Sequence, residues 1–155
     1  MNRPPHDFIR IPLIELRSFA VNCLKAAGLR PDHADQLGKL LSNSDLCGVR
    51  SHGTRQVGSY CPMLRDGLVN PDPELTVFKE TANPDEVRQS NDNMVRGVRE
   101  TMEPVRGHDE ATLPGTIEDR KAKEYTTTGV PIAVEDLERL TDCGRRLGVE
   151  AEWNL

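Results

Sequence analysis

The chain has 155 residues, a usual length for a single domain, and a formal net charge of −5. Hydrophobic residues make up 36% of it and aromatic residues 4%, so we expect a modest core built mainly from aliphatic side chains. The acidic balance removes the electrostatic basis of nucleic-acid binding, and no apolar run approaches the ~18 residues of a transmembrane helix. Residues 1–7 lack the apolar stretch of a signal peptide, which predicts a cytoplasmic location with no membrane partner.

Two amphipathic helices are predicted at the N-terminus, after an extended segment at residues 8–12. The first covers residues 13–27, and Gly28 is a natural stop for it. The second opens at Pro31, with Asp32 as its N-cap. The residues expected to face the core are Leu13, Leu16, Ala20, Leu24 and Ala27 in the first helix, and Ala34, Leu37, Leu40 and Leu41 in the second.

A third helix is predicted from Ser51, a good N-cap residue, to about Gly67. The prolines of residues 70–73 prevent it from continuing, and residues 75–79 are expected to form a short strand. The apolar face of this helix is formed by Val57, Cys61 and Leu64.

The character of the sequence changes after Thr81. Residues 82–92 are polar and predict a linker or junction. A thin apolar stripe on a charged helix follows, formed by Met94, Val95, Val98, Met102 and Val105.

The C-terminal part is predicted to form a turn and two helices. The turn lies at residues 113–115, and a charged helix at residues 118–128 is stopped by Gly129. The last helix covers residues 134–147, with Gly148 as its stop. Its apolar face is formed by Val134, Leu137, Leu140 and Leu147.

No metal site is expected. None of the four cysteines belongs to a Cys-x-x-Cys pair, and the four histidines are scattered, so the paired ligand spacing of a structural zinc site is absent. Cysteines within apolar helical patterns behave as small hydrophobic residues. The residues concerned are Cys23, Cys47, Cys61 and Cys143, and His6, His33, His52 and His108.

The Ser51-His52-Gly53 step is the best candidate for acid–base chemistry. A histidine exchanges protons near neutral pH, and the reduction of a ketone to an alcohol needs a proton as well as a hydride. On the predicted helix, His52, Gln56 and Tyr60 would lie in one row beside the apolar face, and Arg55 could clamp a carboxylate. Each residue also has an ordinary explanation: Ser51 as a cap, His52 and Arg55 as solvated side chains, and Tyr60 as packing.

Two groups of residues carry a resemblance to a known family. Gly48-Val49-Arg50-Ser51-His52-Gly53, Tyr60 and Leu64-Arg65-Asp66-Gly67-Leu68-Val69-Asn70-Pro71 form the first, and residues 113–115, 129–132, 137–140 and 147–149 form the second. Both resemble the malate/L-lactate dehydrogenase-like family of NAD(P)-dependent oxidoreductases, which includes ureidoglycolate, sulfolactate and diketogulonate-type enzymes. The two matches together cover most of residues 13–81 and 105–152.

The resemblance implies hydride transfer between NAD or NADP and a small 2-oxo or 2-hydroxy acid. It implies His52 as proton donor or acceptor together with Ser51, and Arg55 and Tyr60 near the substrate or the nicotinamide. The cofactor-binding residues are not identified, and Pro114 and Gly115 are the only candidates. The resemblance also implies a homodimer whose cleft receives parts of both subunits.

The resemblance further implies a deleted central domain. Members of the family are much longer and carry a cofactor-binding domain between the two matching segments, whereas residues 82–104 contain too few aliphatic side chains for a buried parallel sheet. We therefore expect an N-terminal segment at residues 1–81, a junction at residues 82–104, and a C-terminal segment at residues 105–155 that packs back on the first. The expected fold is mainly α with a few short strands, the host domain of the family without its insert.

Two other functions remain open. The chain could serve as a non-catalytic helical module that dimerises or binds a full-length relative. A metal-dependent hydrolase using His52 would need a ligand set that the sequence does not show.

Overall fold

The computed structural model describes residues 4–74, 89, 92–94, 96–97 and 115–153. The chain divides into one unit of residues 1–73 with 117–155 and a second of residues 74–116. In the second unit, the described residues from 89 to 97 are helical, and Arg96 donates a hydrogen bond to Asn93 at 2.6 Å. The predicted strand at residues 75–79 and most of the predicted stripe helix lie outside the described residues.

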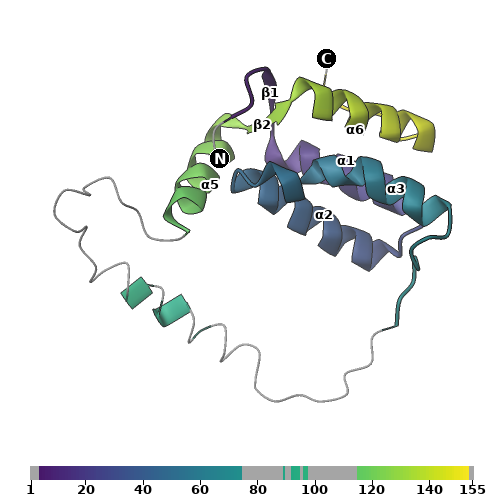
Figure 1. The fold of residues 1–155 in the computed structure, drawn as a ribbon, viewed down its shortest axis with the longest axis horizontal. Helices are drawn as coiled ribbons and strands as arrows, with labels where there is room; N and C mark the ends of the chain where they lie inside the picture. The colour runs from purple at the N-terminus through teal and green to yellow at the C-terminus, as the bar shows by residue number, and fades with distance from the viewer. Residues whose placement is uncertain (1–3, 75–88, 90–91, 95, 98–114, 154–155) are drawn as a thin grey trace. The chain divides into compact units, whose positions relative to one another are not determined.

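The first unit is mainly helical with two short strands, as predicted (Figure 1). The helices begin and end close to the predicted residues, except at the start of α3. The elements are β1 (Phe8–Ile11), α1 (Leu13–Ala26), α2 (Pro31–Leu46), 3-10 turns at Arg50–His52 and Thr54–Gln56, α3 (Val57–Arg65), α5 (Thr116–Thr128), β2 (Val130–Ala133) and α6 (Val134–Leu147).

The two strands join the N-terminal and C-terminal parts of this unit. They pair antiparallel, with Phe8 opposite Ala133 and Ile11 opposite Val130. Gly129 turns the chain into β2 with a φ of 82°, and a Cβ there would lie 3.2 Å from the Cβ of Arg10. Glycine therefore suits this position both for its backbone angle and for the close approach of β1.

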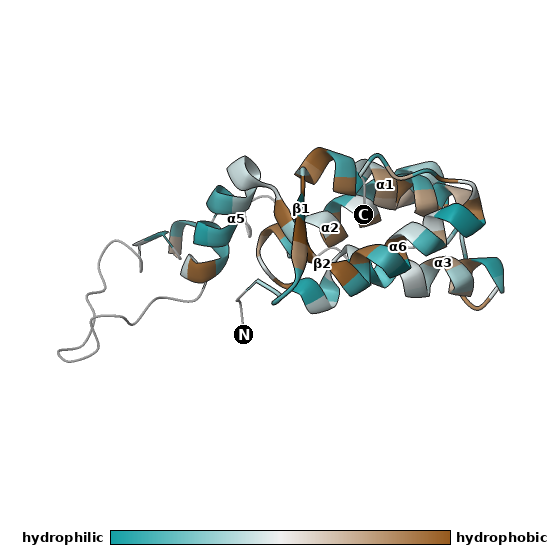
Figure 2. Cartoon of the chain, turned by 90° about the horizontal axis from the view of Figure 1, so that it is seen from above, coloured by the Kyte–Doolittle hydropathy of each residue, from teal (hydrophilic) through white to brown (hydrophobic). Residues whose placement is uncertain are grey.

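Helices α1, α2, α3 and α6 enclose the core. Gly38 allows α2 to approach α1 closely, since a Cβ there would collide with the side chain of Val21. The buried stripe of α2 therefore passes through Gly38, and Leu40, predicted to face the core, is 58% exposed. Figure 2 shows that the strands are largely hydrophobic and α5 largely hydrophilic. The buried apolar residues include Leu16, Leu24, Val57, Cys61, Leu137 and Leu140.

Two further features concern the helices. The predicted N-cap Asp32 instead lies inside the first turn of α2, where its side chain pairs with Arg30 at 2.7 Å, because Pro31 already occupies the first helical position. Among the described residues, no helix combines the length and the apolar character that crossing a bilayer requires.

Candidate functional site

The Ser-His-Gly step does not begin a continuous helix. Residues Arg50–His52 and Thr54–Gln56 form two 3-10 turns, and α3 begins only at Val57. Gly53 separates the turns in an extended conformation, with φ −91° and ψ −163°. The predicted helix start at Ser51 is therefore wrong, and His52 and Tyr60 do not share one helical row.

Asp45, near the end of α2, explains this break. Its buried carboxylate accepts hydrogen bonds from the backbone N–H of Thr54 at 2.7 Å and from the Thr54 hydroxyl at 2.6 Å. A Cβ on Gly53 would collide with the same carboxylate. The side chain thus acts as a cap for the second turn from outside the local sequence.

The pKa of the Asp45 carboxyl group is also shifted. Burial raises its pKa from 3.8 to about 6, while the two hydrogen bonds from Thr54 act in the opposite direction. The nearby charge of Asp136 raises the pKa further, and that of Arg50 lowers it.

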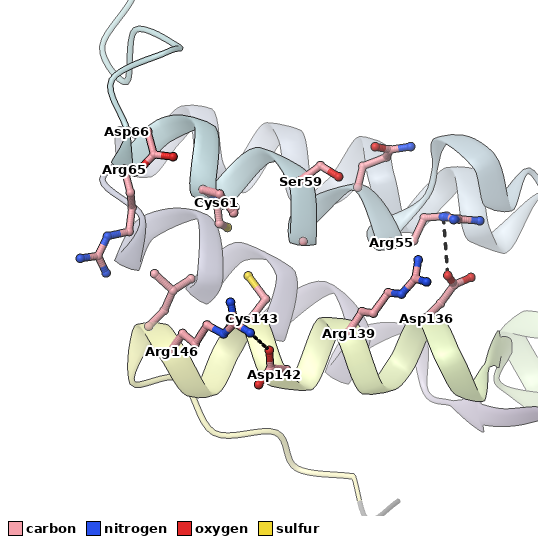
Figure 3. A pocket seen from close by; sticks show the side chains of 14 residues that line it. Arg55, Ser59, Cys61, Arg65, Asp66, Asp136, Arg139, Asp142, Cys143 and Arg146 are labelled. Carbon is pink, nitrogen blue, oxygen red and sulfur yellow. Dashed lines mark ion pairs between the residues drawn. The ribbon is translucent and has the colours of Figure 1, made fainter.

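Asp136, at the start of α6, ties the two turns to the C-terminal segment. Its carboxylate is 5% exposed and lies 3.4 Å from the Arg50 guanidinium and 3.6 Å from Nε of Arg55. Its Oδ1 accepts no hydrogen bond from the described residues, and its contact with Arg55 is electrostatic. Arg55, predicted to bind a substrate carboxylate, is directed to a carboxylate of the protein itself (Figure 3).

Ser51 and His52 lie on the exposed side of the first turn. The Ser51 hydroxyl and Nδ1 of His52 are 2.8 Å apart, and the Gln56 side chain donates to the Ser51 carbonyl at 2.7 Å. In the described part of the chain no hydrogen bond engages Nε2 of His52. That nitrogen is therefore available for proton exchange with a bound molecule.

The other predicted site residues are dispersed. Tyr60 lies on α3 with 36% of its surface exposed, and within the described residues no hydrogen bond links His52 to Arg55 or Tyr60. Gly115 precedes α5 with a φ of 84°, and Pro114 lies outside the described residues. Among the described residues of the predicted site, Ser51 and His52 are the pair joined by a side-chain hydrogen bond.

A groove of about 550 Å³ runs between α3 and α6 (Figure 3). Arg55 and Gln56 lie on its wall, while Ser51, His52 and Tyr60 do not. Its lining was not anticipated from the sequence, because it combines residues of two distant segments. The charged and sulfur-bearing residues that line it are Arg55, Arg65, Asp66, Asp136, Arg139, Asp142, Arg146, Cys61 and Cys143.

Comparison with known proteins places the turns in a family context. The family model of malate/L-lactate dehydrogenase matches residues 11–84. This part of the chain is therefore similar to the malate/L-lactate dehydrogenase family. The matched segment contains Ser51, His52, Arg55 and Tyr60, whereas Pro114 and Gly115 lie outside it.

Two curated relatives match the chain over a similar length. A malate dehydrogenase of Pyrococcus abyssi is 31% identical over 74 residues, and one of Pyrococcus horikoshii is 34% identical over 74 residues. These matches cover 48% of this chain but only 20% and 21% of the relatives. The solved malate dehydrogenase structure of Pyrococcus horikoshii OT3 matches with 32% identity and a TM-score of 0.47, over 51% of this chain and 23% of that one. The chain thus spans about a fifth of the length of the malate dehydrogenases it matches.

The described residues do not fit the nicotinamide dinucleotide that the family resemblance implies. A dinucleotide site needs a glycine-rich turn between a parallel strand and a helix. In the described ranges the strands are two and antiparallel, and β2 passes into α6 at Ala133 and Val134 with no glycine between them. The same ranges contain no cluster of three or more side chains able to hold a metal ion.

Proposed function

We propose that this chain is by descent a cytoplasmic 2-hydroxy acid oxidoreductase of the malate/lactate type, impaired by an internal deletion, in which His52 exchanges the proton of the reaction. The observation that carries the proposal is the Ser51–His52 contact of 2.8 Å inside the family segment. The substrate class is a small 2-oxo or 2-hydroxy acid, and the electron carrier is NAD or NADP.

The proposed proton transfer uses the free ring nitrogen. During reduction, Nε2 of protonated His52 gives its proton to the carbonyl oxygen of the 2-oxo acid, and during oxidation the neutral ring accepts the hydroxyl proton. Ser51, held at Nδ1, fixes the orientation of the ring. Arg55 binds the substrate carboxylate when it exchanges its 3.6 Å contact with Asp136 for the ligand, and Tyr60 is the further residue proposed to bind the substrate.

The proposal includes a homodimer and an internal deletion. The match to a fifth of each relative, together with the pairing of β1 and β2, supports a host domain whose inserted cofactor domain is missing at residues 82–104. The surrounding nucleotide sequence tests the deletion, because an unread coding segment at the junction would restore the missing domain.

Activity is tested on the full chain with NADH or NADPH and a panel of 2-oxo acids, after titration of each cofactor by fluorescence. Turnover should fall by about 10²–10⁴-fold in His52→Ala, since the variant loses its general acid. His6→Ala is the matched control, because His6 is 98% exposed and outside the proposed site. Absence of cofactor binding at millimolar concentration would end the claim of independent dehydrogenase activity, and unchanged turnover in His52→Ala would remove His52 from the mechanism.

A second function, a non-catalytic helical dimerisation or interaction module, is favoured by exposed apolar side chains near the end of α3. Met63, Leu68 and Val69 are 38%, 71% and 40% exposed, and the Leu68 N–H bonds to the Met63 carbonyl, which holds two of them together. Sedimentation velocity with wild type and Leu68→Glu tests this function. A wild-type dimer that becomes a monomer in Leu68→Glu would support this function. A wild-type monomer that also does not bind a full-length relative would refute it.

A further inference from the structure

Two cysteines face each other at the base of the groove between α3 and α6. Cys61 lies on α3 and Cys143 on α6, and both line the groove (Figure 3). Each thiol lies close enough to the other to change its pKa, and the Cys143 thiol donates a hydrogen bond to the carbonyl oxygen of Val57 at 3.9 Å. Both are free thiols in this structure.

The two thiols differ in reactivity. The neighbouring Cys61 thiol and the charge of Arg146 lower the pKa of Cys143, against the effects of burial and of Asp142. The neighbouring Cys143 thiol, together with burial, raises the pKa of Cys61. Cys143 also retains 9% exposure against 1% for Cys61. Cys143 is therefore the thiol that reacts first, and Cys61 is placed to resolve the product.

The walls of the groove favour an anionic reagent. Arg65 and Arg139 line it, and within the described residues neither forms an ion pair. The other two arginines of the lining are paired, Arg55 with Asp136 and Arg146 with Asp142. Guanidinium groups that line the groove and have no ion pair among the described residues attract carboxylates.

We propose that Cys61 and Cys143 form a dithiol site that is oxidised to an intramolecular disulfide by a small disulfide carrying carboxylate groups. The Cys143 thiolate attacks one sulfur of the reagent, forms a mixed disulfide and releases one small thiol. Cys61 then attacks the Cys143 sulfur, releases the second small thiol and forms the Cys61–Cys143 bond. The two protein thiols lose two electrons and two protons. The reagent disulfide takes up these electrons and protons and becomes two small thiols.

The disulfide would join two parts of the chain that are far apart in sequence. Cys61 belongs to the dehydrogenase family segment and Cys143 to the C-terminal helix α6. Oxidation would therefore fix the groove between them, and reduction by small thiols would release it.

The site is tested by incubating the full chain with glutathione disulfide, trapping free thiols by alkylation and mapping the peptides by mass spectrometry. Wild type should lose two alkylatable thiols and yield a linked Cys61–Cys143 peptide, and Cys47→Ala should behave identically. Complete oxidation without that linked peptide would overturn the proposal.

Two variants test the order of attack. Cys61→Ala should accumulate the mixed disulfide at Cys143, whereas Cys143→Ala should take up no glutathione at Cys61; the reverse pattern would overturn the assignment.

Arg139→Gln should slow the reaction with glutathione disulfide several-fold and leave the reaction with uncharged hydroxyethyl disulfide unchanged. Equal slowing of both would refute the anionic specificity. Thermal unfolding of each variant checks that it is folded, and the wild-type peptide map decides the proposal independently.

Discussion

Replacing Asp45 by Asn should remove a distinctive pH dependence of stability. The wild-type carboxylate is buried beneath the Ser-His turns and accepts two hydrogen bonds from Thr54. An amide oxygen at the same place can accept the same bonds but carries no charge. The substitution therefore separates the geometry of the cap from the cost of burying its charge.

The size of the effect follows from the pKa. Burial raises the pKa of Asp45 from 3.8 to about 6, so the folded state binds this proton more tightly than the unfolded state. With ~1.4 kcal/mol per pKa unit, the proton contributes about 3 kcal/mol of stability at low pH. This contribution is complete below about pH 4 and is lost as the pH rises through about 6.

Urea denaturation from about pH 4 to pH 7 measures the free energy of unfolding of both chains. The difference between wild type and Asp45→Asn should change by about 3 kcal/mol across this window, because the other carboxylates cancel in the comparison. Thr54→Val is a matched variant: it removes a hydrogen bond that favours the charged carboxylate, so the pKa of Asp45 should rise further and the window should extend to higher pH. A constant difference between wild type and Asp45→Asn at every pH would refute the reasoning.

Two further substitutions test the surroundings of the turns. Gly53→Ala should lower the free energy of unfolding by about 1–3 kcal/mol, because its Cβ collides with the Asp45 carboxylate. Gly58→Ala, whose Cβ meets nothing within 4 Å, should instead stabilise α3 by about 0.5–1 kcal/mol, and equal effects in urea titrations would contradict the collision. Asp136→Ala should cost about 1–2 kcal/mol, less than a fully buried pair because Arg50 and Arg55 are 31% and 39% exposed. If thermal unfolding of this variant matches wild type, Asp136 does not hold the turns.

The helices could be predicted because their signals are local. The end of α6 at Gly148 was predicted from a glycine after a periodic apolar face, and Gly148 does adopt the left-handed conformation with a φ of 72°. The buried face of α3, with Val57, Cys61 and Leu64, was likewise predicted from helical spacing. Such patterns depend on neighbours within a few residues.

The features that the sequence did not reveal depend on distant partners. Gly38 lies at the contact of α2 with Val21 of α1, a role that spacing within α2 does not predict. Residues Val130–Ala133 gave no strand signal, since Pro131 disfavours a strand and the pairing partner is β1. The break at Gly53 depends on Asp45, which lies eight residues earlier, near the end of α2. The one sequence signal for it is the order of an aspartate near the end of a helix followed later by a Gly-Thr pair.

The position of Ser51 and His52 depends on both ends of the chain. One carboxylate beneath their turns, Asp45, comes from the family segment, and the other, Asp136, comes from α6. Arg50 immediately precedes Ser51, and its guanidinium lies 3.4 Å from the Asp136 carboxylate. This ion pair attaches the first turn to a helix more than eighty residues later in the sequence. Since an unpaired guanidinium and an exposed β1 edge would remain without the C-terminal segment, residues 1–84 alone should not hold these turns in place. The C-terminal segment is thus part of the candidate site, although its own residues lie outside the matched family segment.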